Sequence, residues 1–237
     1  MADLEEVAAQ YKTTLGGQQF LLYDSAADEN FDAEGRVLVF ATRKNLEELA
    51  RSSTWFVDGT FKVCPTIFTQ LFTIMGTVSQ THRRDDCTQL ALPFVYALLS
   101  SKAQCLYEAV FHAVLDSAER YGIQQCQPSR IMSDFENAIL NASKTVFPTI
   151  PTTGCMFHLG QNIYRHVQSE GLQSDYQDPS DDSVRKATHM LLSLAFLPPA
   201  DVIDGFQKLQ DVVPNSMTPI LKYFDLNYLR GRRRRGR

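Results

Sequence analysis

The segment from residue 54 to residue 171 alternates short apolar runs with longer amphipathic patterns, and this order strongly limits the fold. Three apolar runs rich in β-branched and aromatic residues come first, at 54–63, 67–78 and 88–100, and each predicts a strand. Residues 103–122 then have helical spacing and end at Gly122, which suits the position after a helix. Strands at 130–132 and 154–157 follow, each running into a helical pattern. Three strands followed by alternating helices and strands predict an α/β fold, a mixed sheet flanked by helices.

The remainder of the chain divides around this segment. Residues 1–45 predict a strand-rich lead-in with strands at 20–24 and 37–42, and residues 46–171 form the predicted core. Residues 172–229 predict an all-helical segment with helices at 184–197, 200–213 and 218–229. The last eight residues, 230–237, form an arginine-rich tail.

The charge of the chain is segregated. The tail holds six arginines, and removing them from the net charge of −4 leaves −10. They are Arg230, Arg232, Arg233, Arg234, Arg235 and Arg237. Any contact with a polyanion is therefore predicted to involve the tail, although a run of this kind is more often a solvated end or a nuclear address than a specific binding surface. No apolar stretch approaches the roughly 20 residues that span a bilayer, and the acidic start is unlike a signal peptide. We expect an intracellular, nuclear protein with no membrane contact.

Two aspartates are candidate metal ligands, and each has a structural alternative. Asp58, in "TWFVDGTF", precedes a glycine between apolar runs, which is also typical of a two-residue hairpin turn. Asp134, in "SDFENA", lies at a predicted helix start, where Ser133 and Glu136 have the spacing of a capping box. Taken singly, neither aspartate establishes a metal site.

The two aspartates become a candidate metal site together when both are placed in one sheet. A sheet with the strand order of ribonuclease H brings the first and fourth strands side by side, and Asp58 and Asp134 would then meet. Paired carboxylates suit Mg²⁺, or Mn²⁺ in its place, which is bound by hard oxygen ligands. Two such ions about 4 Å apart can promote in-line phosphoryl displacement.

Cys155 and His158, in "GCMFH", have a spacing that could supply half of a zinc site. No second half with usable spacing follows, because no cysteine lies beyond Cys155. Zinc is therefore disfavoured, and a packed thiol beside a hydrogen-bonded histidine is the preferred interpretation.

Five blocks in this order resemble the Mutator-like element (MULE) transposase domain, in particular the animal branch found beside FLYWCH-type zinc fingers. The blocks are "RVLVFATRKNLEELARSSTWFVDGTFKVCPTIFTQLFTIMG", "LPFVYALLSSKAQCLYEAVFHAV", "SDFENAI", "GCMFHLGQNIYRHV" and "ILKYFDLNYLRGRRRRGR". The resemblance implies a ribonuclease H-like core interrupted by a helical insertion. It also implies Mg²⁺-dependent DNA cleavage and strand transfer by an Asp, Asp, Glu triad. Asp58 and Asp134 match the first two acids, and Cys155 and His158 match an accessory Cys-x-x-His pair.

The third acid of this branch belongs to an "NNxxE" block that follows the basic segment, and no such block occurs in the 237 residues. We therefore expect a truncated catalytic domain whose triad is incomplete and which is inactive alone. DNA is the expected partner, and a second copy of the chain is a further candidate. A non-catalytic DNA-binding or interaction module derived from a transposase is the alternative. A third, weaker interpretation is a nuclease in which Asp225 or Glu136 completes the site.

Overall fold

The structure, a computed structural model, describes residues 6–83 and 86–230. The chain forms two compact units, Met1–Cys155 and Met156–Arg237, which are described separately. The division falls before the helix that starts at Met156, whereas the predicted boundary of the core lies after residue 171.

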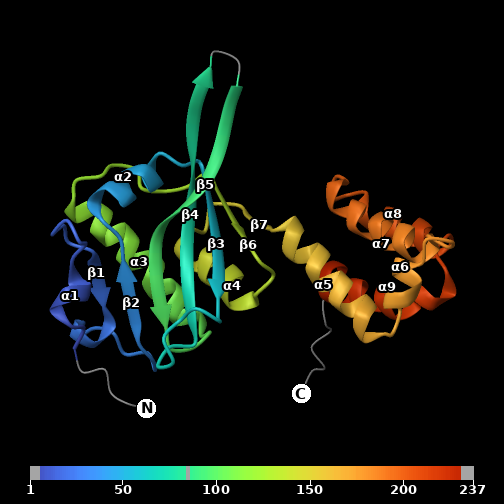
Figure 1. Cartoon of the computed structure of the whole chain (residues 1–237), viewed down its shortest axis with the longest axis horizontal. Helices are drawn as coiled ribbons and strands as arrows, with labels where there is room; N and C mark the ends of the chain where they lie inside the picture. The colour runs from blue at the N-terminus through green and yellow to red at the C-terminus, as the bar shows by residue number, and fades with distance from the viewer. Residues whose placement is uncertain (1–5, 84–85, 231–237) are drawn as a thin grey trace. The chain divides into compact units, whose positions relative to one another are not determined.

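The first unit is built on one mixed sheet of seven strands in the order β1-β2-β5-β4-β3-β6-β7 (Figure 1). Strand β4 runs antiparallel to both β5 and β3, and β6 and β7 continue the sheet parallel to β3. The strands are β1 (Leu21–Asp24), β2 (Val37–Phe40), β3 (Thr54–Thr60), β4 (Gln70–Arg83), β5 (Asp86–Leu99), β6 (Arg130–Ser133) and β7 (Thr152–Gly154). The predicted mixed sheet and its three consecutive strands are confirmed.

Helices connect and cover these strands. They are α1 (Ala9–Lys12), the 3-10 turn η1 (Ser25–Ala27), α2 (Arg43–Ala50), α3 (Gln104–Arg120) and α4 (Asn137–Val146). Helix α3 buries Leu106, Val110 and Val114 completely, which is the face that its sequence spacing predicts. It ends at Arg120, and the φ of +70° at Gly122, two residues later, allows the Ile123 amide to reach back to the carbonyl of Ala118 at 2.9 Å. This is a Schellman-type stop, which favours glycine because that residue adopts positive φ without strain.

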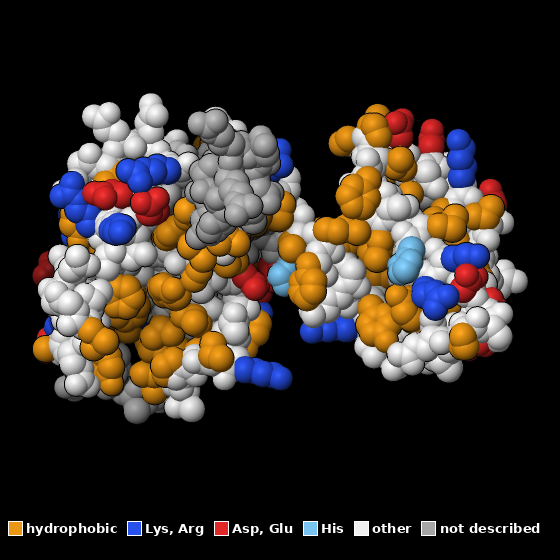
Figure 2. Space-filling model, turned by 45° about the horizontal axis from the view of Figure 1, so that its top comes forward, with side chains coloured by type: hydrophobic (Ala, Val, Ile, Leu, Met, Phe, Trp, Pro, Cys, Tyr) orange, Lys and Arg blue, Asp and Glu red, His pale blue; other side chains and the backbone are white. Residues whose placement is uncertain are grey.

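The two faces of the sheet differ in how they are covered. Alternate residues of β3 and β4, among them Trp55, Val57, Phe72 and Ile74, pack in the main core and are at most 2% exposed. The opposite face carries a separate, smaller cluster around Leu38. An open apolar groove runs beside that cluster over β2 and β5. Figure 2 shows hydrophobic side chains gathered on the exposed surface of the first unit. Because side chains alternate along a strand, Asp58 projects away from the main core.

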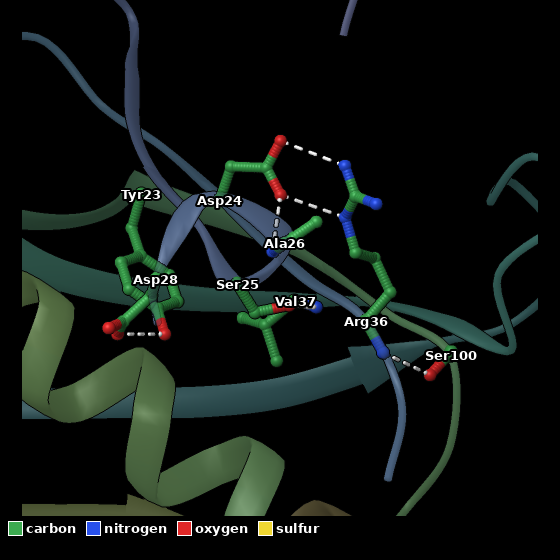
Figure 3. Close-up of polar contacts among 8 residues, drawn as sticks. All are labelled: Tyr23, Asp24, Ser25, Ala26, Asp28, Arg36, Val37 and Ser100. Carbon is green, nitrogen blue, oxygen red and sulfur yellow. Dashed lines mark hydrogen bonds and ion pairs between the residues drawn. The ribbon is translucent and has the colours of Figure 1, made fainter. Parts of the chain in front are cut away.

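The lead-in joins the sheet at its outer edge. Strand β1 pairs with β2, and β2 pairs with β5, so both extend the sheet beyond the three central antiparallel strands. Arg36 and Asp24 form an ion pair at 2.8 Å beside the Tyr23 and Asp28 hydrogen bond (Figure 3). The connection between β1 and β2 is thus held by polar groups as well as by pairing.

The second unit is helical throughout its described part, as predicted for residues 172–229. Its elements are α5 (Met156–Ser169), α6 (Gln173–Gln177), α7 (Ser183–Ser193), η2 (Leu194–Phe196), α8 (Val202–Gln210), η3 (Asn215–Met217), α9 (Thr218–Phe224) and η4 (Asp225–Leu229), which is a π-helix. Across residues 6–83 and 86–230, none of the helices combines the length and apolar character that crossing a membrane requires.

Candidate functional site

Asp58 lies within strand β3 and not in a turn. It pairs with Thr73 of β4, and the pairing continues through Gly59 with Phe72 and Thr60 with Leu71. The Asp-Gly hairpin turn considered from the sequence is therefore wrong. The local Asp-Gly signal was overridden because the antiparallel pairing of β3 with β4 continues past it as far as Thr60.

Asp134 directly follows strand β6. Its Oδ1 atom accepts a hydrogen bond from the backbone amide of Glu136 at 3.0 Å, so the carboxylate tightens the turn that leads into α4. The predicted capping box is wrong: Glu136 itself is the N-cap residue of α4, and the helix start has no side-chain cap bond. The Ser133 hydroxyl instead donates to the Asp134 carbonyl at 2.7 Å.

The register of three parallel strands brings the candidate residues to one edge of the sheet. Val57 of β3 pairs with Ser133 of β6, which pairs with Gly154 of β7. Asp58, Asp134 and Cys155 each come one residue later, at successive positions along that edge. The Cys155 amide donates to the Ser133 carbonyl at 2.7 Å, so the hydrogen bonding to β6 extends one residue past the end of β7.

Glycines allow close packing at two of these strand ends. A Cβ atom added to Gly59 would lie 2.5 Å from the Gln70 Oε1 atom, well inside a normal contact. A Cβ atom at Gly154 would overlap the ring of Phe135. The glycines that follow Asp58 and precede Cys155 are thus required by neighbouring side chains.

A chain of hydrogen bonds lies beside the aspartates, on the helix-covered side of the sheet. The Tyr107 hydroxyl donates to Glu136 Oε1 at 2.6 Å and accepts from Gln70 Nε2 at 2.6 Å. Lys102 Nζ donates to the other Glu136 oxygen at 2.7 Å and lies 4.1 Å from the centroid of the Phe61 ring. Gln70 and Tyr107 are fully buried. Both oxygens of Glu136 are therefore already engaged by short bonds.

The protonation of Tyr107 follows from this environment. Burial raises the pKa of its hydroxyl well above the ordinary value, outweighing the opposite effect of the Gln70 hydrogen bond. The carboxylates of Glu136 and Asp134 raise the pKa further. Tyr107 is therefore a neutral hydrogen-bond donor at physiological pH.

The donor set fits a divalent cation in part. Asp58 and Asp134 supply hard carboxylate oxygens at adjacent register positions, which is the chemistry that Mg²⁺ prefers. Within residues 6–83 and 86–230, however, no group of three or more His, Cys, Asp or Glu side chains could hold a metal ion. Among the described residues, Glu136 thus forms no such group with the two aspartates.

The other predicted site residues lie elsewhere or stay untested. His158 is in the first turn of α5, in the second unit, and its accessory role stays a prediction. Asp225 begins η4 and forms an ion pair with Arg230 at 3.0 Å. The predicted DNA-binding residues Arg232, Arg233, Arg234, Arg235 and Arg237 lie outside the described residues.

Sequence reasoning missed Gln70, Tyr107 and Lys102. Tyr107 matches the apolar pattern of a helix that packs in the core, and Gln70 begins a strand. No motif links them, because they are 37 residues apart and meet only through the fold. A polar glutamine in an otherwise apolar strand pattern was the one available signal.

Comparison with known proteins agrees with the predicted family. No curated protein gives a match to this chain. The family model of the MULE transposase domain matches residues 54–162, a range that contains Asp58, Asp134, Cys155 and His158. Residues 54–162 are therefore similar to the MULE transposase domain.

Proposed function

We propose that the first unit is a ribonuclease H-like core derived from a Mutator-like transposase, and that Asp58 and Asp134 bind a divalent cation there. The observation that carries this proposal is the register of β3 and β6, which sets the two aspartates at adjacent positions. The strand order β5-β4-β3-β6-β7, antiparallel and then parallel, supports it further. The animal FLYWCH-associated branch and the status of the helical unit as an insertion belong to the same proposal.

The division of labour follows from the residues. Asp58 and Asp134 would hold Mg²⁺ or Mn²⁺ by one carboxylate each, leaving positions for water and for a DNA phosphate. The cation would polarise the phosphate and lower the pKa of a bound water. Cys155 follows β7 at the same edge, where its side chain is half-buried, and would shape that side of the site.

Binding of Mn²⁺ tests this proposal without requiring catalysis. In the full chain, Asp58→Asn and Asp134→Asn should each weaken Mn²⁺ binding by roughly tenfold or more, measured by electron paramagnetic resonance. Asp116→Asn is the matched control, since Asp116 is exposed on α3, and it should bind as the native chain does. Native affinity in both site variants would reject the metal site.

We also propose that the 237-residue chain binds DNA without cutting it. The observation that favours this second function is that no group of three His, Cys, Asp or Glu side chains among the described residues could hold a metal ion. A misplaced or missing ligand disturbs in-line geometry, where about 1 Å can cost roughly a hundredfold in rate. Purified chain should not nick supercoiled plasmid in Mg²⁺ or Mn²⁺. Metal-dependent nicking that Asp58→Asn abolishes would refute this and favour a complete nuclease.

The arginine tail would supply sequence-independent affinity in the nucleus. Cationic groups that neutralise phosphates release counterions, so removal of residues 230–237 should weaken DNA binding and flatten its dependence on salt. Binding that is unchanged at low salt would leave the tail as a linker or address.

A further inference from the structure

Two segments that carry the candidate metal ligands are linked by side chains on the helix-covered side of the sheet. Asp58 projects away from the main core, whereas the next residue, Gly59, turns its α-carbon toward the buried Gln70 side chain. Gln70 donates to Tyr107, and Tyr107 donates to Glu136. The chain of bonds therefore starts beside one aspartate and ends two residues from the other.

The final link to Asp134 is made by the backbone. The Glu136 amide donates to Asp134 Oδ1 at 3.0 Å, so the position of Glu136 fixes the turn that presents the Asp134 carboxylate. The Glu136 side chain is 18% exposed and is held at both oxygens, by Tyr107 and by Lys102. A carboxylate this far from water is stable only with such partners, and therefore it has little freedom to move.

Within this series of hydrogen bonds, one polar atom has no partner among the described residues. Gln70 Oε1 is buried and has no hydrogen-bond partner among the described residues, although its amide nitrogen donates to Tyr107. An unpaired buried carbonyl costs free energy, so an apolar residue at this position would satisfy the core better. The glutamine side chain instead lies close to the α-carbon of Gly59, the residue that follows Asp58.

We propose that the Gln70, Tyr107 and Glu136 chain is a positioning network, which holds the carboxyl ends of β3 and β6 at the separation that a shared cation requires. This inference rests on the proposed metal site and adds residues to it that have no ligand role. Lys102 closes the network at the surface, where its side chain is 44% exposed. Glu136 acts through Asp134 and does not itself bind metal.

Tyr107→Phe is the principal test, with Tyr23→Phe as the matched control. Each substitution removes a tyrosine hydroxyl that donates to a carboxylate in the first unit, but Tyr23 lies on edge strand β1 and bonds to Asp28. In the full chain, Tyr107→Phe should weaken Mn²⁺ binding roughly tenfold, while Tyr23→Phe should leave it unchanged. If Asp58→Asn abolishes Mn²⁺ binding and Tyr107→Phe does not weaken it, the positioning role is wrong and the metal site stands.

Hydrogen exchange supplies a measurement that needs no metal. Tyr107→Phe should speed amide exchange roughly fivefold or more in peptides covering both 56–61 and 132–137, and Tyr23→Phe should not. Unchanged exchange in these peptides would overturn the network. If the native chain binds no Mn²⁺, the metal site fails, and this exchange measurement alone decides whether the network links the two strand ends.

Glu136 distinguishes positioning from ligation. Glu136→Gln keeps an acceptor for Tyr107 and should retain Mn²⁺ affinity within about threefold, whereas Glu136→Ala should lose roughly tenfold. A loss in Glu136→Gln as large as that in Asp58→Asn would identify Glu136 as a ligand and overturn the inference. If Tyr107→Phe does not fold, as judged by circular dichroism, the two Glu136 variants provide the same test.

Discussion

Two sites in the first unit use the same chemistry with different consequences. At the edge of the sheet, Tyr23 donates to Asp28 at 2.8 Å, and Asp24 pairs with Arg36 through two bonds of 2.8 Å (Figure 3). At the ends of β3 and β6, a tyrosine and a cation again meet carboxylate oxygens at 2.6 and 2.7 Å. Each site thus joins a tyrosine hydroxyl, a cation and acidic groups.

The difference lies in how the donors are shared and what they anchor. At the edge, each donor has its own carboxylate, and Asp24 also accepts the Ala26 amide at 3.0 Å. At the strand ends, one carboxylate, Glu136, takes both donors. The edge site therefore fastens a loop to the sheet, whereas the other site fastens the backbone beside two aspartates. A cluster of a tyrosine and carboxylates therefore indicates function only through the segments that it holds in place.

The largest expected effect is a loss of stability, without a loss of metal binding, when the edge site is disrupted. Asp24→Ala removes the carboxylate that accepts two bonds from Arg36, and the two side chains are only 14% and 20% exposed. We expect a loss of about 3 kcal/mol in the free energy of unfolding, since removing one member of a largely buried ion pair is strongly destabilising. Unfolding in urea followed by the fluorescence of Trp55, the one tryptophan, measures this in the first unit.

Mn²⁺ affinity should be unchanged in the same Asp24→Ala variant, because three strands separate edge strand β1 from β3 in the sheet order. Asp24→Asn, which still accepts hydrogen bonds, should lose less stability. The edge site would not be independent of the metal site if Asp24→Ala weakened Mn²⁺ binding as strongly as Asp58→Asn does.

A smaller effect is expected when the space beside Gln70 is filled. Gly59→Ala introduces a Cβ atom 2.5 Å from Gln70 Oε1, so either the amide or the strand must shift. Overpacking of this kind costs about 1–3 kcal/mol, and here it should also weaken Mn²⁺ binding. Gly160→Ala, in helix α5, is the control, because its Cβ atom would lie at an ordinary contact distance of 3.8 Å from Leu192. The control should be neutral or more stable by about 0.5–1 kcal/mol. Equal stability of both variants would show that Gln70 is free to move.

The sequence was sufficient for much of the sheet, because its information is local and periodic. The alternation in β3 and β4 predicted which residues enter the core, and the expected strand order correctly made β3 and β6 neighbours. Strand ends were less accurate. The apolar run at 154–157 predicted a strand, but β7 ends at Gly154, and Met156 and Phe157 begin α5. Those two side chains are 38% and 68% exposed, so the apolar character of the run did not reflect burial.

The positioning network was beyond sequence reasoning for a physical reason. Its members come from β4, α3 and the turn before α4, and each has an ordinary local role in its own element. Glu136 was expected to bond to Ser133 in a capping box, since that spacing is common at helix starts. Tertiary packing instead offered it Tyr107 and Lys102, which are stronger partners than a backbone amide.

The smallest expected effect compares the two tyrosines by their response to alkaline pH. Burial is the main cause that raises the pKa of both hydroxyls above the ordinary value of 10, and their carboxylate partners raise it further. The facing acids are Glu136 and Asp134 for Tyr107, and Asp28, Asp24 and Asp116 for Tyr23.

A raised folded-state pKa means that the unfolded chain loses its proton first as the pH increases. The stability that each hydroxyl contributes is therefore complete below about pH 10 and falls as the pH rises toward the folded-state pKa. For a buried tyrosine that stays protonated, the fall reaches about 1.4 kcal/mol by pH 11. Urea unfolding at pH 9 and pH 11 should show this fall in the native chain. The fall should be smaller by about 1 kcal/mol in Tyr107→Phe, and by less in Tyr23→Phe, whose hydroxyl site is only partly buried. An equal response of both variants would mean that the edge site and the strand-end site are equally shielded from water, and it would remove the distinction in burial between them.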